Sequence, residues 1–126
     1  MRRHPALEKL SRDHQHALAV ALKARRGEPG AAEALREFLE TEGYEHFALE
    51  ERVLLPAFVP YGDVEDPRVV RMLLDHVRLR AVDHLELVAA GELLNAHVRL
   101  EEREIFPWIE EAMPEPALDA LGRALH

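Results

Sequence analysis

The stretch His46–Pro56 reads HFALEERVLLP, and the stretch His97–Pro107 further along the chain reads HVRLEEREIFP. Six of the eleven positions are identical: the histidine, one leucine, two glutamates, an arginine and the proline. On an α-helix, residues four apart are separated by about 40° around the axis, so the histidine and the first glutamate of each copy share a face. Each copy therefore presents an imidazole and a carboxylate side by side. We expect the rest of the chain to be organised around these two motifs.

The composition is typical of a helical domain. The chain has 126 residues, of which 48% are hydrophobic and 32% are charged. The hydrophobic residues are mainly alanine, leucine and valine, with few aromatics, and this mixture favours an all-α fold. The length suits one domain with a real core, and we expect residues 1–126 to form it.

Composition also narrows the functional classes. The chain has no cysteine, which excludes disulfides, thiolate metal sites and cysteine nucleophiles. A net charge of −8 argues against nucleic-acid binding, which needs a basic surface. The start, MRRHPALEKL, has no apolar signal core, and no apolar run approaches the roughly 20 residues of a membrane span. We therefore expect a cytoplasmic protein without a membrane partner, and the sequence leaves a homodimer open.

Apolar periodicity and turn signals predict four helices joined by short links. Gly27 and Gly30 mark the first link, and the segment PYGDVEDP at 60–67 marks the second. The third link lies between residues 84 and 91, where Gly91 is a candidate helix end. The predicted helices span residues 5–26, 31–55, 67–83 and 88–112, with a short additional helix in 117–126. Helices of this length with short links form an up-down-up-down four-helix bundle.

This topology predicts which residues meet at one level. Two residues on neighbouring antiparallel helices lie level when they are equally far from the link between them. The midpoints of successive pairs fall at residue 30, at residue 63 and near residues 86–87, inside the three predicted links. The layer selected in this way contains His14, His46, Glu50, His76, His97 and Glu101. His84 is an alternative to His76, because its midpoint with His97 falls at Gly91.

Four imidazoles and two carboxylates in a bundle interior predict a metal centre. Such groups are costly to bury unless they are paired or bound to metal. Imidazole and carboxylate ligands together suit iron, manganese or zinc. Six groups serve two ions if each ion takes two histidines and both Glu50 and Glu101 bridge. The two carboxylates together with an oxide bridge then balance most of the charge of two ferric ions. This arrangement leaves positions for a small ligand such as O₂, NO or peroxide.

The remaining polar residues near the motifs are expected to lie outside this layer. Glu51 and Glu102 are about 140° from their histidines around the helix. We expect them to face solvent or to pair with the neighbouring Arg52 and Arg103. Glu42, one turn before the first motif, is a candidate for an outer or spare ligand. His16 is expected on the surface.

The sequence resembles the hemerythrin-like, or HHE cation-binding, domains. The resemblance lies in the four segments RDHQHAL, HFALEERVLLP, LDHVRLR and HVRLEEREIFP, and it covers about residues 5–112. It implies a four-helix bundle with a non-haem di-iron centre held by the six residues named above. Oxygen-carrying members have a second histidine one turn after the ligand of the third helix, where this chain has Arg80. They also use an aspartate five residues after the fourth-helix histidine, where this chain has Glu101 at four. Coordination of the carrier type is therefore not expected.

The predicted function is a non-haem di-iron protein that binds or senses O₂, NO or peroxide, in the response to oxidative stress or in iron handling. One alternative is a di-iron oxidoreductase that turns over peroxide or O₂. A second is a structural helical bundle that holds zinc or no metal. These alternatives differ in metal content and in turnover, which the sequence does not specify.

Overall fold

The computed structural model describes residues 2–126, so the first residue of the predicted domain 1–126 lies outside it. The described residues form helices and turns without strands, which confirms the all-α class. After a 3₁₀ turn at Pro5–Leu7, the helices are α1 (Glu8–Arg25), α2 (Ala31–Glu40), α3 (Glu42–Leu49), α4 (Leu55–Phe58), α5 (Pro67–Arg80), α6 (Leu87–Leu100), α7 (Phe106–Ala112) and α8 (Glu115–Leu125). None of these helices is long and apolar enough to cross a bilayer.

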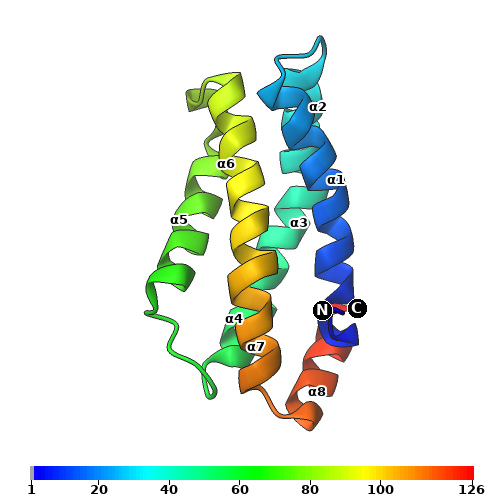
Figure 1. Ribbon diagram of the computed structural model, residues 1–126, viewed down its shortest axis with the longest axis vertical. Coiled ribbons are helices and arrows are strands. Elements are labelled where there is room, and N and C mark those ends of the chain that lie inside the picture. Colours follow the sequence, from blue (N-terminus) through cyan, green and yellow to red (C-terminus); the bar gives the residue numbers. More distant parts are fainter. Residues whose placement is uncertain (1) are drawn as a thin grey trace.

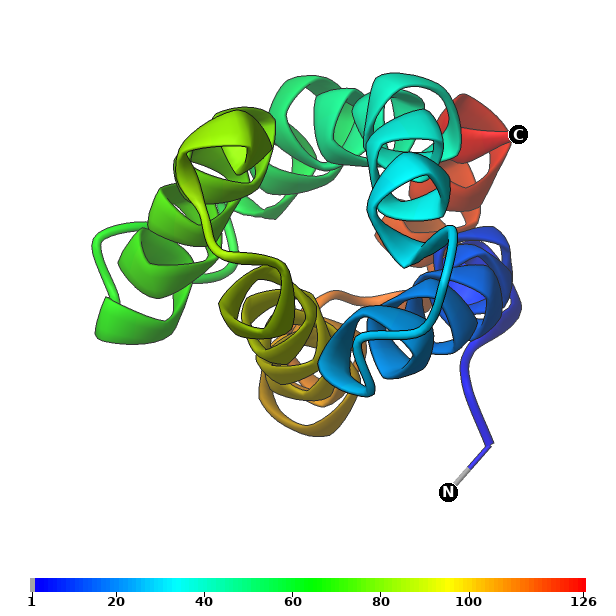
Figure 2. The same ribbon diagram turned by 90° about the horizontal axis from the view of Figure 1, so that it is seen from above.

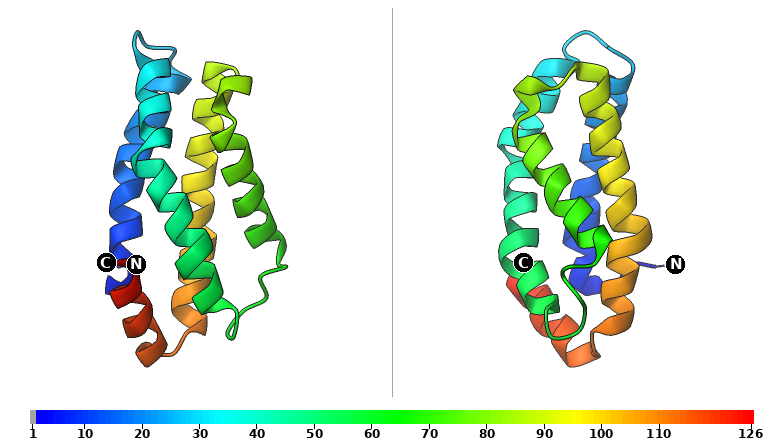
Figure 3. Two further views of the ribbon diagram at one scale, coloured as in Figure 1. Left: turned by 180° about the vertical axis from the view of Figure 1, so that it is seen from behind. Right: turned by 90° about the vertical axis from the view of Figure 1, so that its left-hand side faces the viewer.

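The helices group into four columns that run along the long axis of the molecule (Figure 1). One column is α1, a second is α2 with α3 and α4, a third is α5, and the fourth is α6 with α7. Seen from above, the columns surround a common centre (Figure 2). The longest helix–helix contact joins α1 to α6, while α5 packs mainly against α6 and the turn that follows it. α8 lies across the end of the bundle near the Pro5–Leu7 turn (Figure 3).

Local signals set the ends of several helices. Gly27 follows α1 with a φ of 61°, and Gly30 precedes α2 with a φ of 78°, conformations that glycine adopts without strain. Asp66 accepts a hydrogen bond from the Arg68 amide and caps α5. Glu86 accepts from two amides at the start of α6 in the same way. The third link spans residues 81–86 and contains a 3₁₀ turn at Val82–His84, so α5 ends three residues before the predicted end at 83 and the link begins before the predicted 84–91.

Gly91 does not end a helix, contrary to the sequence-based prediction. It lies inside α6, where a Cβ would be 2.8 Å from both the Ala21 carbonyl oxygen and the Ala24 Cβ. The absent side chain allows α6 to approach the α1 backbone closely. This contact brings together the two columns that carry His14 and His97.

Both copies of the motif contain a π-helical turn, which the sequence analysis did not anticipate. The turns span Glu50–Leu54 and Glu101–Ile105. In each, the amide just before the motif proline bonds to the carbonyl five residues back, on the ligand glutamate. A proline has no amide hydrogen and its ring crowds the preceding turn of an α-helix, so a widened turn accommodates it. The second column therefore continues through Pro56 to Phe58, three residues beyond the predicted end at residue 55.

The polar layer lies between two apolar cores. One core is built around large side chains such as Leu10, Phe58, Met72 and Phe106, and α8 adds leucines to it. The other is rich in alanine and lies beyond the layer, around the contact of α1 with α6. The two cores exclude water from both ends of the layer, so any ion there is held away from bulk solvent.

Candidate metal centre

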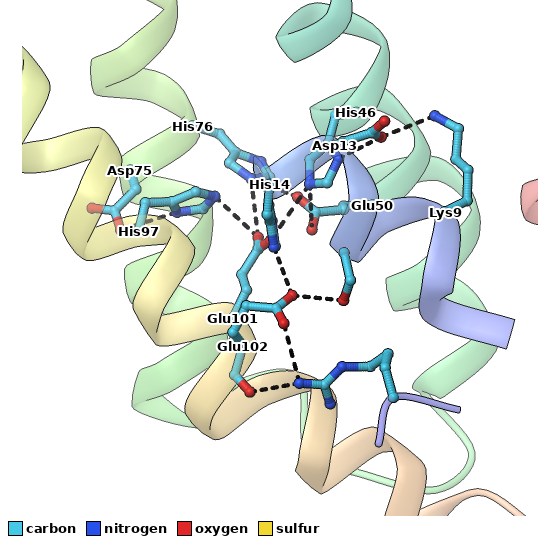
Figure 4. Close-up of polar contacts among 12 residues, drawn as sticks. Lys9, Asp13, His14, His46, Glu50, Asp75, His76, His97, Glu101 and Glu102 are labelled. Carbon is cyan, nitrogen blue, oxygen red and sulfur yellow. Dashed lines mark hydrogen bonds and ion pairs between the residues drawn. The ribbon is translucent and has the colours of Figure 1, made fainter. Parts of the chain in front are cut away.

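The six residues selected from the sequence lie together in the bundle interior (Figure 4). Each column contributes, and every one of the six is at most 4% exposed. They fall into two groups whose ligand atoms lie within 4.8 Å of one another: His14, His46, Glu50 and Glu101 in one, and Glu50, His76, His97 and Glu101 in the other. The two glutamates belong to both groups, as the bridging scheme requires.

The two glutamates divide their oxygen atoms between the two pairs of histidines. Glu50 Oε2 lies 3.2 Å from His46 Nε2, and Glu50 Oε1 lies 3.1 Å from His76 Nε2. Glu101 Oε1 lies 2.8 Å from His14 Nε2, and Glu101 Oε2 lies 3.0 Å from His97 Nε2. Every histidine thus presents Nε2 to the centre, and each carboxylate faces both pairs.

The donor atoms fit metal ions. The buried atoms without a hydrogen-bond partner include Nε2 of three histidines, both carboxylate oxygens of Glu50 and Oε2 of Glu101. Unpartnered polar atoms are costly to bury, and here they face one another. Nitrogen and oxygen ligands at about 2.1 Å from an ion are about 3.0 Å apart when they subtend a right angle. The observed separations are close to this value, and the mixture of imidazole and carboxylate suits iron, manganese or zinc.

A second set of carboxylates holds the outer nitrogen of every histidine. Each Nδ1 lies within hydrogen-bond distance of an acidic side chain from a neighbouring column. The four pairs are His14 with Glu102 (2.7 Å), His46 with Asp13 (3.0 Å), His76 with Glu51 (2.6 Å) and His97 with Asp75 (3.2 Å). These contacts form a closed circuit, because each column supplies the acceptor for the next and the fourth supplies it for the first. We call these four acceptors the outer carboxylates.

Each outer carboxylate is in turn bound by a cationic side chain. The pairs are Lys9 with Asp13 (3.0 Å), Arg80 with Glu51 (2.8 Å), Arg71 with Asp75 (3.1 Å) and Arg3 with Glu102 (3.3 Å). Such contacts orient the outer carboxylates. A carboxylate that accepts from Nδ1 fixes the tautomer in which Nε2 has a free lone pair for a metal.

The two buried glutamates favour positive charge in the centre, either as protons on the histidines or as metal ions. Burial disfavours the charged form of His97, yet Glu101 and Asp75 raise its pKa to about 10. Burial also lowers the pKa of His76, but Glu101 and Glu50 raise it to about 9. For the carboxyl of Glu101, burial raises the pKa, but the histidines, with His97 foremost, hold it well below its usual range. Protons or metal ions therefore neutralise the carboxylates, and metal binding has to displace protons from the imidazoles.

The outer carboxylates are the residues that the sequence analysis missed. Glu51 and Glu102 were expected to face solvent or to pair with Arg52 and Arg103. They instead accept hydrogen bonds from histidines of adjacent columns. The expectation was wrong because these histidines belong to other columns, and the angle around one helix does not show them. A signal was present nonetheless. Every outer carboxylate is adjacent in sequence to one of the six inner residues, as in Asp75-His76.

The other candidates lie away from the centre. His84 is exposed in the turn after α5, so it is His76, fully buried, that faces the glutamates. His16 is exposed and pairs with Glu42, which is therefore not in contact with the six inner residues. Arg80 pairs with Glu51 and its guanidinium lies 5.8 Å from the centre of the Phe47 ring. Arg80 therefore orients an outer carboxylate and does not serve as a metal ligand.

A small apolar cavity adjoins the inner residues. Its volume is about 10 Å³, and it is lined mainly by apolar side chains together with Asp13, His14, His46 and His97. Such a space has room for about one water-sized molecule. The packed side chains around this space leave no room for a larger molecule.

The all-α fold and the buried cluster of histidines and glutamates are features of a helical cation-binding protein. Comparison with known families supports this class: the model of the hemerythrin HHE cation binding domain matches residues 4–109. The chain belongs to the hemerythrin HHE cation-binding domain family. The matched segment contains all six inner residues and all but one of the residues in the outer shell of carboxylates and cations, the exception being Arg3. No curated protein and no solved structure matches this chain.

Proposed function

We propose that this chain is a non-haem di-iron protein that binds or senses a small oxidant or diatomic ligand, such as O₂, NO or peroxide. His14 and His46 would hold one ion and His76 and His97 the other, with Glu50 and Glu101 shared. Iron bound there would supply reversible one-electron chemistry and open positions for a small ligand. We also interpret the four columns as one up-down-up-down bundle, which Figure 1 supports.

The observation that carries this proposal is the division of the carboxylate oxygens. A glutamate that serves one ion can turn both oxygens to it or leave one free. Here each glutamate directs one oxygen to each pair of histidines. Two ions rather than one account for this arrangement, because the four imidazole nitrogens and four carboxylate oxygens exceed the six positions of an octahedral ion.

The surroundings support a role in sensing or reaction rather than in carriage. The residue one turn after His76 is Arg80, whose side chain is engaged by Glu51. The chain thus offers no extra imidazole there, and one face of the centre stays open to small ligands. The adjoining cavity is apolar and small, which suits an uncharged ligand of two or three atoms.

The chain's own residues orient the ligands and exclude water. The outer carboxylates fix the tautomer of each imidazole, and the aromatic rings of Phe47 and Phe106 stack on His76 and His14. These contacts hold the rings in place before an ion arrives. A preorganised donor set lowers the cost of ordering side chains when the ions bind.

Metal analysis combined with optical spectroscopy tests this proposal. Protein from iron-replete cells is expected to hold two iron ions per chain and to absorb in the near ultraviolet and visible when oxidised. After anaerobic reduction, admission of O₂ should restore the oxidised spectrum quickly. One ion in fully loaded protein would contradict the bridging scheme, and zinc without absorbance would indicate a structural bundle. Long-lived, reversible O₂ uptake would place the chain with the carriers instead.

A further inference from the structure

The outer face of α5 carries a stripe of exposed apolar side chains. Val70, Leu73, Leu74 and Val77 are 45%, 37%, 46% and 62% exposed. Half of the large hydrophobic residues that are exposed in residues 2–126 lie on this one helix. We call these four residues the α5 stripe. Single exposed apolar residues need no explanation, but a contiguous group on one face indicates a binding surface.

The spacing of the α5 stripe is that of a helix–helix interface. The four residues stand at positions i, i+3, i+4 and i+7, which lie on one side of a helix over about 11 Å. The opposite side of α5 faces the bundle through Val69, Met72, Asp75, His76 and Leu79. No other column covers the outer side, since α5 lies at the edge of the molecule (Figures 1 and 2). Anchors with this spacing are typical of a helix that packs against another helix or into a groove.

The charges around the α5 stripe select the kind of partner. α5 carries four arginines and one aspartate, although the chain as a whole has a net charge of −8. Arg71 and Arg78 flank the stripe on one side and Arg80 on the other, and all three are exposed. Arg71 and Arg80 are partly engaged by outer carboxylates, whereas Arg78 forms no ion pair within the described residues. An apolar strip bordered by arginines is complementary to an apolar strip bordered by carboxylates.

A second copy of this chain fits the α5 stripe poorly. In a two-fold contact the same surface meets itself, and antiparallel α5 helices would bring equivalent flanks together. Arg71 and Arg78 of one copy would then lie beside the same arginines of the other. An anionic membrane attracts the arginines, but the acidic remainder of the chain opposes it, and the stripe has no aromatic anchors.

We propose that the outer face of α5 is a docking surface for a partner protein, which binds through an amphipathic helix whose apolar stripe is flanked by aspartate or glutamate. The partner's apolar side chains pack on Leu73 and Leu74, and its carboxylates pair with Arg78 and Arg71. This inference stands independently of which metal the centre holds.

Binding of designed helical peptides to the full chain tests the proposal. One peptide carries leucines at i, i+3, i+4 and i+7 with flanking glutamates, and the second has lysines in place of the glutamates. By fluorescence anisotropy, the glutamate peptide is expected to bind at least about tenfold more tightly. Arg78→Glu should reverse this preference. Leu73→Ser with Leu74→Ser should weaken binding by at least about tenfold.

A matched control separates docking from general stickiness. Leu22 on α1 is exposed to 40%, so Leu22→Ser removes exposed apolar surface away from the α5 stripe and should leave peptide binding unchanged. Equal binding of the two peptides, no binding, or equal sensitivity to Leu22→Ser would overturn the proposal. It would also be overturned by a dimer in solution that the stripe substitutions dissociate, or by stripe-dependent binding to vesicles of anionic lipid. Circular dichroism of each variant verifies that it is folded.

Discussion

The outer carboxylate Asp75 provides a direct test of how the centre is held, through Asp75→Asn. Asp75 is 1% exposed, and its Oδ2 lies 3.2 Å from His97 Nδ1 while its Oδ1 accepts from Arg71. The amide has nearly the same shape but no charge, and it can present its NH₂ group to the imidazole. We expect His97 to lose its fixed tautomer and part of its basicity as a ligand, without a change in the number of inner donors.

The magnitude follows from the burial of this hydrogen bond. A hydrogen bond to a charged group contributes about 1.5–3 kcal/mol, and each 1.4 kcal/mol is about a factor of ten in affinity. We therefore expect metal affinity to fall by about 10- to 100-fold, the range usual for outer partners of metal ligands. Asp75 also raises the pKa of His97, so proton competition weakens in the variant. The loss at neutral pH should accordingly lie near the lower end of this range.

The assay is anaerobic titration of ferrous iron against a coloured chelator, with iron per chain measured separately. Asp83→Asn is the matched control, because Asp83 pairs with Arg36 on the surface and contacts no histidine. The control should bind iron as the wild-type chain does. Unchanged affinity in Asp75→Asn would refute the role assigned to the outer carboxylate, and an equal loss in both variants would attribute the effect to general destabilisation.

Three further predictions concern the inner residues and the packing around them. Glu101→Ala should lose both ions, since its oxygens face both histidine pairs, whereas His16→Ala should lose none; metal analysis distinguishes them. Metal removal should lower the melting temperature and leave a pH-dependent fold. Two histidines have pKa values of about 9 and about 10 when folded, above roughly 6.5 when unfolded. Their contribution is thus present below pH 6.5 and lost as pH rises through 9 to 10, and thermal melts of metal-free protein should show the decline. Gly91→Ala should cost about 1–3 kcal/mol in chemical denaturation, because the new Cβ meets the Ala21 carbonyl. A gain in stability from the better helix former would contradict this.

Much of the fold follows from the sequence because its signals are local. Glycine and proline mark the links, and the three-four periodicity identifies the buried faces. The level argument works for His76 because antiparallel helices with short links place equal offsets at equal heights. It also explains why His84, eight residues further along α5 and its following turn, cannot reach the layer.

The parts that sequence reasoning did not predict depend on the geometry between helices. Each π-helical turn accommodates a proline inside a helix that continues beyond it. From the sequence, the same proline is equally consistent with a helix end. The partner of Glu102 is His14, on a column far away in sequence. Glycine is common at helix ends, but Gly91 lies inside α6, where the close approach of α1 leaves no room for a side chain.

α5 has fewer buried apolar residues to anchor it than any other column. Two of its five buried residues are Asp75 and His76, so only Val69, Met72 and Leu79 anchor it through apolar contacts. Its inner face carries one candidate ligand and one outer carboxylate, while Arg71 and Arg80, each bound to an outer carboxylate, border its exposed stripe. Ions bound on the inside and a partner bound on the outside would therefore act on the same helix. Asp75 is hydrogen-bonded both to His97 in the centre and to Arg71 beside the stripe. A change that moves Asp75 would therefore also move Arg71, which connects the proposed docking face to the layer of inner residues.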